Sequence, residues 1–112
     1  MTSHDAMKAL IDKFNVKPDL KNDAKAWSGS KFQFKPSDTA AFCIQFSEDG
    51  TLSMTDGEIT DAKNVFTGAD QVLEDIINGK LDGVKAFLFG KLKVSGDLSS
   101  AQKLVALLKR AG

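Results

Sequence analysis

Cysteine, histidine, net charge and long hydrophobic runs are all scarce in this 112-residue sequence. With Cys43 as the single cysteine, no intramolecular disulfide can form, and a reducing compartment is expected. Lysine and arginine number 15, as do aspartate and glutamate, so no overall positive field attracts nucleic acid. The longest apolar runs, 40–44 and 104–108, are far shorter than the about 20 residues of a membrane span. Multidomain enzymes, collagen-like chains, coiled coils and membrane-spanning proteins are therefore not expected.

Residues that could support catalysis are equally few. The single histidine, His4, is expected to lie in a frayed N-terminus, which argues against a Cys–His or Ser–His–Asp site. Leucine follows both Gly79-Lys80 and Gly90-Lys91, so neither pair belongs to a Gly-x-x-x-x-Gly-Lys-Ser/Thr phosphate loop. The acidic residues at 56, 58 and 61 lack the glycine position and the final glutamate of a calcium loop. We therefore predict no enzyme activity, no metal and no cofactor.

The two ends of the chain carry no recognisable targeting pattern. Met1–Asp5 is polar and leads into an amphipathic stretch, unlike a secretory signal. Lys109–Gly112 differs from a peroxisomal tripeptide of the Ser-Lys-Leu type. We expect a cytoplasmic location.

The spacing of hydrophobic residues predicts the secondary structure. A helix is predicted over 3–14, capped by Thr2 or Ser3, and a loop that can include a turn of helix over 17–30. The period then changes to two, which predicts strands over 32–34, 42–46, 52–54 and 64–67. Helical spacing returns over 70–77 after a capping box at Thr67–Asp70, and again after Asp82. A fifth strand over 92–94 and a helix capped by Asp97 complete the chain.

One face of the predicted strands is apolar, whereas the other carries Lys, Gln, Ser and Thr. A sheet buried on both faces would show continuous apolar runs instead. Helices are therefore expected to cover one face of a mostly antiparallel five-stranded sheet and to leave the other face wet. The predicted fold class is α+β in two layers, as a single domain over residues 1–112.

Basic residues on the predicted outer face allow two interpretations. They are Lys31, Lys35, Lys91 and Lys93. Either they solvate that face and prevent strand pairing, or they contact an anionic membrane surface, where each would add about 1 kcal/mol. Nucleic acid is disfavoured as a partner by the zero net charge and the single arginine.

Large aromatic rings gather on the predicted inner face, namely Phe32, Phe34, Phe42, Phe46 and Phe66. These rings either close an ordinary core or line an apolar cavity between the sheet and the helices. The pattern does not separate the two possibilities, because composition does not report packing density.

The stretch 79–104 contains a Gly-Lys pair, a short capped helix with Ala86-Phe87, the run Gly90–Val94 and then Gly96. In order and spacing it resembles the signature of the sterol carrier protein 2 family. The rest of the chain agrees with that family in element order rather than in residues. Gly83 stands where a proline is common, and the peroxisomal tripeptide of some members is missing.

The resemblance implies a five-stranded sheet with helices on one face and an apolar tunnel between them. It also implies that this tunnel binds fatty acids, fatty acyl-CoA, sterols or phospholipids with low selectivity. Together with the inner-face pattern, it predicts the following lipid-binding residues: Phe34, Phe42, Ile44, Phe46, Met54, Phe66, Leu73, Ile76, Ile77, Phe87, Phe89, Leu104 and Leu108.

Three functions compete on this basis. The preferred one is a monomeric, intracellular, non-specific lipid carrier for long-chain fatty acids or acyl-CoA, with the C-terminal helix (98–110) as a mobile lid. The second is an accessory module that presents a lipid intermediate to a partner enzyme. The third, a small enzyme acting on an acyl substrate, is disfavoured because no base or nucleophile is predicted to face inward.

Overall fold

The computed structural model describes all 112 residues as five α-helices, one short 3₁₀ helix and five strands. In chain order these are α1 (Ser3–Asn15), α2 (Pro18–Ala24), η1 (Lys25–Trp27), β1 (Lys31–Pro36), β2 (Phe42–Phe46), β3 (Leu52–Asp56), β4 (Asn64–Gly68), α3 (Asp70–Ile77), α4 (Gly83–Leu88), β5 (Lys93–Gly96) and α5 (Leu98–Lys109).

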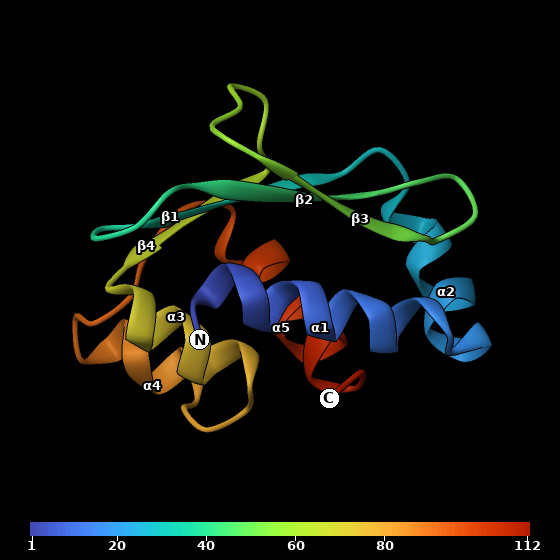
Figure 1. Ribbon diagram of the computed structural model, residues 1–112. Coiled ribbons are helices and arrows are strands. Elements are labelled where there is room, and N and C mark those ends of the chain that lie inside the picture. Colours follow the sequence, from blue (N-terminus) through green and yellow to red (C-terminus); the bar gives the residue numbers. More distant parts are fainter.

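The strands form a single sheet in the order β3-β2-β1-β4-β5. Three of the four strand pairs are antiparallel, and β1 with β4 is parallel. The α-helices all lie on one face of this sheet (Figure 1). The α+β prediction, with a mostly antiparallel five-stranded sheet covered by helices on one face, is therefore confirmed.

Two α-helices precede the first strand where the sequence predicts one. At the start of α1, Thr2 Oγ1 accepts from the Asp5 N–H while the Asp5 carboxylate accepts from the Thr2 N–H. The stretch 17–30, predicted as a loop with a turn of helix, is more helical than expected, because it contains α2 and η1. Pro18 stands in the first turn of α2, where its missing N–H costs nothing. Of α2 only Leu20 and Ala24 are buried, which is too few to produce a visible period.

Asp70 joins the N-terminal ends of α1 and α3. The predicted capping box at Thr67–Asp70 was wrong, because Thr67 remains in β4, paired with both neighbouring strands. Asp70 instead accepts hydrogen bonds from the N–H and the hydroxyl of Ser3, at 3.1 and 2.6 Å, and from the Thr39 hydroxyl at 3.1 Å. Its side chain is buried, so these donors replace the water that the carboxylate loses.

The single histidine also has fixed neighbours. His4 lies in the first turn of α1, and its Nε2 is 2.7 Å from Oδ1 of Asp56 at the end of β3. Its ring packs edge-on against Phe42 of β2, with 5.6 Å between the ring centroids. The prediction of a frayed N-terminus around His4 was therefore wrong, because contacts distant in sequence hold α1 against the sheet.

The outer face of the sheet is not wholly wet. Residues 57–63, which connect β3 to β4, project beyond this face and cover part of it (Figure 1). Gln33 on β1 is buried beneath the connection: its Nε2 donates to the carbonyls of Phe42 and Gly57, and its Oε1 accepts from the Ile59 N–H at 2.7 Å. A polar strand residue thus satisfies the backbone of a loop that would otherwise lack partners.

Three phenylalanine rings on adjacent strands stack in a row beneath the sheet. Phe34 of β1 stacks on Phe42 of β2, with centroids 5.2 Å apart, and on Phe66 of β4, with centroids 5.0 Å apart. The strand register produces this row, since Phe34 is the direct partner of both residues. α1 covers the sheet on the Phe42 side of the row, where its buried residues are Met7, Leu10, Ile11 and Phe14 among others.

Replacing Asp70 by alanine should lower the free energy of unfolding by about 2 kcal/mol or more, because Ser3 and Thr39 lose a shared acceptor in a buried position. Urea denaturation followed by circular dichroism measures this loss. The matched control is Asp75→Ala on the same helix, whose carboxylate accepts only from the Gln71 side chain, and it should stay within about 0.5 kcal/mol of the wild type. Equal losses in the two variants would contradict the assigned role of Asp70.

Candidate functional site

A cavity of about 660 Å³ lies between the inner face of the sheet and helices α3, α4 and α5. This volume falls within the range of sites that hold small organic molecules. The sheet contributes Phe34, Phe66 and Val94, from β1, β4 and β5. Sixteen of the 23 residues that line the cavity are hydrophobic, so its chemistry suits an apolar ligand.

Eight of the thirteen residues predicted to bind lipid line this cavity. They come from β1, β4 and helices α3, α4 and α5: Phe34, Phe66, Leu73, Ile76, Ile77, Phe87, Leu104 and Leu108. The three α3 residues share one side of that helix because they recur at a spacing of three and four.

Four of the remaining five lie on the other part of the inner face, away from the cavity. Phe42, Ile44 and Phe46 are fully buried on β2, and Met54 on β3 is the direct partner of Ile44. α1 fills the space beneath them; Phe14, for example, packs edge-on against Phe46 with 6.0 Å between centroids. The same strand face therefore forms a closed core on one side and a cavity on the other.

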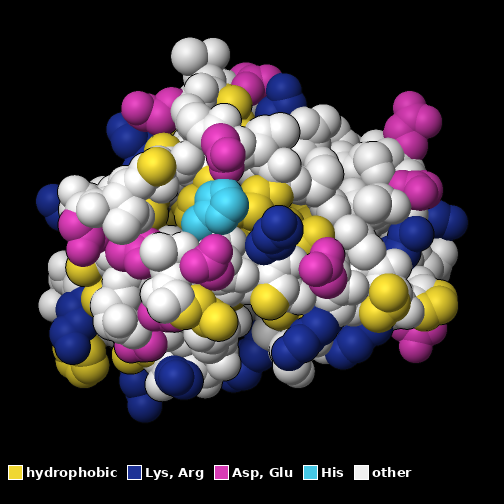
Figure 2. Space-filling view, viewed as in Figure 1, with side chains coloured by type: hydrophobic (Ala, Val, Ile, Leu, Met, Phe, Trp, Pro, Cys, Tyr) yellow, Lys and Arg dark blue, Asp and Glu magenta, His cyan; other side chains and the backbone are white.

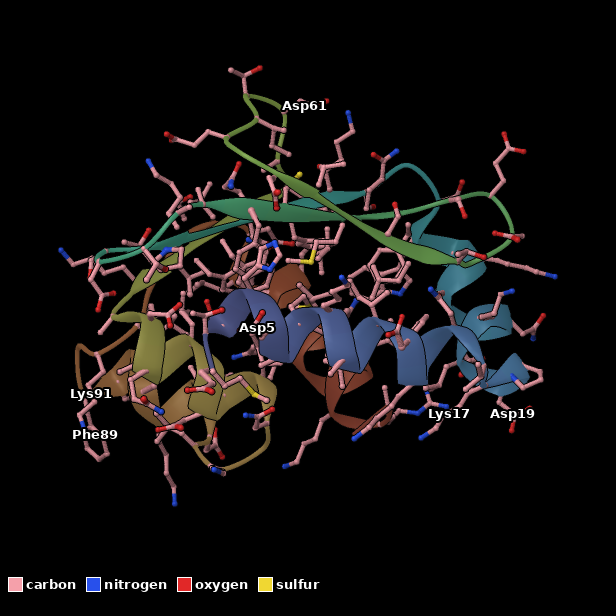
Figure 3. All side chains as sticks on the ribbon, in the orientation of Figure 1. Asp5, Lys17, Asp19, Asp61, Phe89 and Lys91 are labelled. Carbon is pink, nitrogen blue, oxygen red and sulfur yellow. The ribbon has the colours of Figure 1, made fainter.

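Phe89, the fifth, points away from the molecule. It follows the last residue of α4 and is 74% exposed (Figure 3). The backbone N–H groups of Lys91 and Leu92 both donate to the Ala86 carbonyl, so the chain reverses here and returns Leu92 to the core. This tight reversal leaves Phe89 on its outer side.

Sequence reasoning missed eight further apolar lining residues: Leu81, Val84, Leu92, Val94, Leu98, Ala101, Val105 and Ala106. On α5, Leu98, Ala101 and Val105 follow the i, i+3, i+7 spacing of one helix face. Their pattern is visible in the sequence. Which apolar side of α5 faces the cavity depends on how the helix packs, and this packing is set by residues far away in the sequence.

Few polar side chains border the cavity; they are Asn78, Asp82, Gln102 and Lys109. Asp82 is engaged in capping α4, since its Oδ1 accepts from the N–H groups of Val84 and Lys85 at 2.8 and 3.3 Å. Lys109, near the end of α5, is the one basic side chain of the lining. It is exposed and makes no salt bridge.

Asp97 and Asn64 position the start of α5 over the cavity. Asp97 accepts from the Ser100 hydroxyl at 2.9 Å and from the Ser99 N–H at 3.2 Å, and these hydrogen bonds hold the pKa of its carboxyl below the ordinary value. Buried Asn64 donates through Nδ2 to the carbonyls of Ser95 and Asp97. The connection from β5 to α5 is thereby tied to β4.

The lysines predicted for the outer face do not form one basic surface. Lys31 pairs with Asp61 at 3.0 Å, and Lys35 pairs with Glu58 at 2.9 Å. Both carboxylates belong to the covering connection between β3 and β4, and the bond from Lys31 lowers the pKa of Asp61. Lys91 lies beside Phe89 at the end of α4 rather than on a strand (Figure 3). Two of the three lysines that remain on the sheet are therefore neutralised by this connection, and Lys93 on β5 makes no salt bridge.

The histidine and the cysteine of the chain do not lie in the cavity. Its lining contains neither His4 nor Cys43, because His4 pairs with Asp56 and the Cys43 Sγ lies 2.8 Å from the Thr55 Oγ1 on β3. No cluster of three or more His, Cys, Asp or Glu side chains is arranged to hold a metal ion. None of the helices combines the length and the hydropathy that crossing a membrane requires.

Comparison with known sequences gives a family match. The model of the SCP-2 sterol transfer family matches residues 7–109. Peroxisomal multifunctional enzyme A of Dictyostelium discoideum is 37% identical over 76 residues, which make up 67% of this chain and 17% of that protein. The chain thus corresponds to a small part of a much longer relative.

Comparison with solved structures gives the fold. A UbiJ-SCP2 ubiquinone synthesis protein superposes with a TM-score of 0.78 at 20% identity, covering 98% of this chain and 95% of that chain. Palmitated SCP2L2 from Aedes aegypti superposes with a TM-score of 0.68 at 16% identity, covering 96% of this chain and 95% of that chain. At these identities the likeness concerns the fold alone.

Acidification should loosen the first turn of α5. Because the folded-state pKa of Asp97 is lowered, its contribution to stability is present above the unfolded value and is lost as the pH falls through the folded value. An NMR titration of the Ser99 amide should therefore report a transition below about pH 4. In Asp97→Asn, which keeps an acceptor oxygen but does not titrate, that transition should vanish; its persistence would assign it to another group.

Proposed function

This chain belongs to the SCP-2 sterol transfer family, and from that premise we propose that it is a non-specific carrier of long-chain lipids, with fatty acids and fatty acyl-CoA as its ligands. Membership of the family implies lipid binding and transfer. The observation that carries the proposal is the largely hydrophobic cavity of about 660 Å³ between the sheet and helices α3, α4 and α5.

An apolar cavity of this kind holds a ligand through its hydrocarbon chain. Each buried methylene contributes about 0.8 kcal/mol, so a long acyl chain binds tightly without a specific polar contact. For the same reason, chains that differ by one methylene are distinguished by only ~1–3 kcal/mol. Low selectivity follows, and the palmitated state of the Aedes aegypti protein supports a fatty acid as one ligand.

The polar end of such a ligand would lie at the edge of the cavity near Lys109. A carboxylate or a CoA phosphate is negative, and Lys109 is the basic side chain of the lining. Lipid release would require α5 to move, since this helix supplies Leu98, Leu104 and Leu108 to the wall. We assign no catalytic step to the cavity, and we place the carrier in the cytoplasm as a monomer; the single cysteine fits a reducing compartment.

An accessory role is the second candidate. The solved structure with a TM-score of 0.78 is described as a ubiquinone synthesis protein, and the Dictyostelium relative is a multifunctional enzyme. Both descriptions support a domain that presents a lipid to an enzyme. Co-purification of a lipid-modifying enzyme with this chain would favour the accessory role over free carriage.

Filling the cavity should weaken ligand binding. Ala101 is buried and lines the cavity, so Ala101→Trp places an indole in the space of the acyl chain. We expect at least a tenfold loss of affinity for palmitate, or about 1.4 kcal/mol, measured by displacement of a fluorescent fatty acid.

Two further variants keep this test decisive. Val105→Phe also enlarges a lining residue, and it covers the case in which Ala101→Trp does not fold. Ala9→Trp adds the same ring at an exposed position of α1 and should bind palmitate like the wild type. If folded Ala101→Trp and Val105→Phe both bind palmitate with wild-type affinity, the cavity is not the lipid site.

Removing the charge of Lys109 should weaken the binding of a ligand with a charged polar end but not of one with an uncharged end. Because Lys109 is exposed, Lys109→Ala should weaken binding of palmitate by no more than about fivefold, which corresponds to ~1 kcal/mol. Binding of hexadecanol, which has no charge, should not change. Titration calorimetry with the two ligands measures the difference, and equal effects on both would place the carboxylate elsewhere.

A further inference from the structure

We propose that the end of helix α4 docks the protein on an anionic phospholipid bilayer and brings the cavity to the lipid that it loads or releases. This docking surface comprises Leu88 and Phe89 together with Lys85, which precedes them by three and four positions, and Lys91, which lies beside Phe89 (Figure 3). The inference rests on the proposed lipid-carrier function and adds to it the membrane surface and the residues that contact it.

Two large apolar side chains stand out from the protein at the end of α4. Leu88 is 72% exposed and Phe89 is 74% exposed. The preceding residues of the same helix, Val84 and Phe87, are also exposed, at 47% and 38%. Positions 84, 87 and 88 lie on one side of a helix, so three of these side chains form a continuous apolar surface. Exposed apolar patches of this kind mark contacts with proteins or membranes.

The exposure of Leu88 and Phe89 is imposed by the fold. The Phe89 N–H donates to the Lys85 carbonyl, and the N–H groups of Lys91 and Leu92 both donate to Ala86, whose side chain is fully buried. Gly90 has a φ of 76°, which glycine adopts without strain. Buried Ala86 and Leu92 anchor both ends of this segment, and Leu88 and Phe89, which lie between them, are held outside.

The docking surface is continuous with the candidate site. Val84, Phe87 and Leu98 are exposed to solvent and also line the cavity. The apolar surface outside the molecule therefore leads into the apolar space inside it. A bilayer in contact with Leu88 and Phe89 would lie next to this entrance, so an acyl chain could pass between them with little exposure to water.

The positive charge of the segment around α4 favours an anionic membrane as the partner. Between residues 79 and 93 the chain has four lysines and one carboxylate, Asp82, although the whole chain has zero net charge. None of these lysines forms a salt bridge, whereas Lys31 and Lys35 of the sheet are both paired. Figure 2 shows a hydrophobic patch next to a basic side chain at its lower left, where Figure 3 labels Phe89 and Lys91. Exposed apolar side chains flanked by unpaired lysines, here Lys85 and Lys91, match the interface of a negatively charged bilayer.

The test is sedimentation of the ligand-free protein with two kinds of vesicle. One contains phosphatidylcholine alone, and the other contains equal parts of phosphatidylcholine and phosphatidylglycerol. We expect binding to the anionic vesicles that weakens as salt is added. Leu88→Ser and Lys91→Glu should each reduce the partition onto these vesicles at least about fivefold, because they remove an inserting side chain and reverse a charge.

Matched controls change the same chemistry elsewhere. Val16→Ser removes an apolar side chain that is 76% exposed after α1, and Lys25→Glu reverses an exposed charge in η1. Both should sediment with anionic vesicles like the wild type. If the wild type fails to bind, or if Leu88→Ser and Lys91→Glu bind as well as these controls, the proposed docking surface is wrong. Failure of the wild type to bind vesicles would point instead to a partner protein that contacts α4.

A parallel measurement separates this inference from the carrier function. Neither Leu88 nor Lys91 lines the cavity, so both variants should bind palmitate in the absence of vesicles with wild-type affinity. Loss of vesicle binding with palmitate binding retained supports the docking surface. Vesicle binding without any palmitate binding by the wild type would overturn the carrier function and leave membrane docking intact.

Discussion

The arrangement of the core and the cavity beneath the sheet depends on the row of stacked rings formed by Phe42, Phe34 and Phe66. β1 is the central strand, and it places Phe34 directly opposite Phe42 in an antiparallel pair and opposite Phe66 in a parallel pair. Each stacked pair is worth about 0.5–1.5 kcal/mol beyond the area that it buries. The row therefore stabilises the strand register, and it also divides the inner face, because Phe42 lies in the closed core while Phe34 and Phe66 line the cavity.

The two sides of this row differ because of the helices that cover them. α1 is one helix of 13 residues, and its long apolar stripe fills the space under β2 and β3. The other side is covered by α3 and α4, which have 8 and 6 residues, together with α5. The short helices end at turns that use positive φ values at Gly79 and Gly90. They form a wall around the space without filling it, so the same sheet face borders both a packed core and an apolar cavity.

Charge is distributed as unevenly as packing. The covering connection between β3 and β4 supplies Asp61 and Glu58 to Lys31 and Lys35, so these two lysines of β1 are neutralised. The four lysines between residues 79 and 93 have no such partners, and the same stretch contains Leu88 and Phe89, which are 72% and 74% exposed. A zero total charge thus conceals a basic region at the place where a lipid would enter. The proposed carrier function and the proposed docking surface both depend on α4, which contributes Val84 and Phe87 to the cavity and Leu88 to the outside.

Features that depend on neighbours in sequence could be predicted from the sequence. Alternating side chains gave the strands and their apolar face, and Asp82 and Asp97 were identified as helix caps, because strand alternation and capping involve residues a few positions apart. The burial of Gln33, the bridging role of Asp70 and the docking of His4 could not be predicted, since they depend on Gly57, Ser3 and Asp56, which lie 24, 67 and 52 positions away. The same limit applies to the site. The sequence determined that Phe42 and Phe66 share an apolar face, but only the packing of α1 on one side and three separate helices on the other decided which of them borders a cavity.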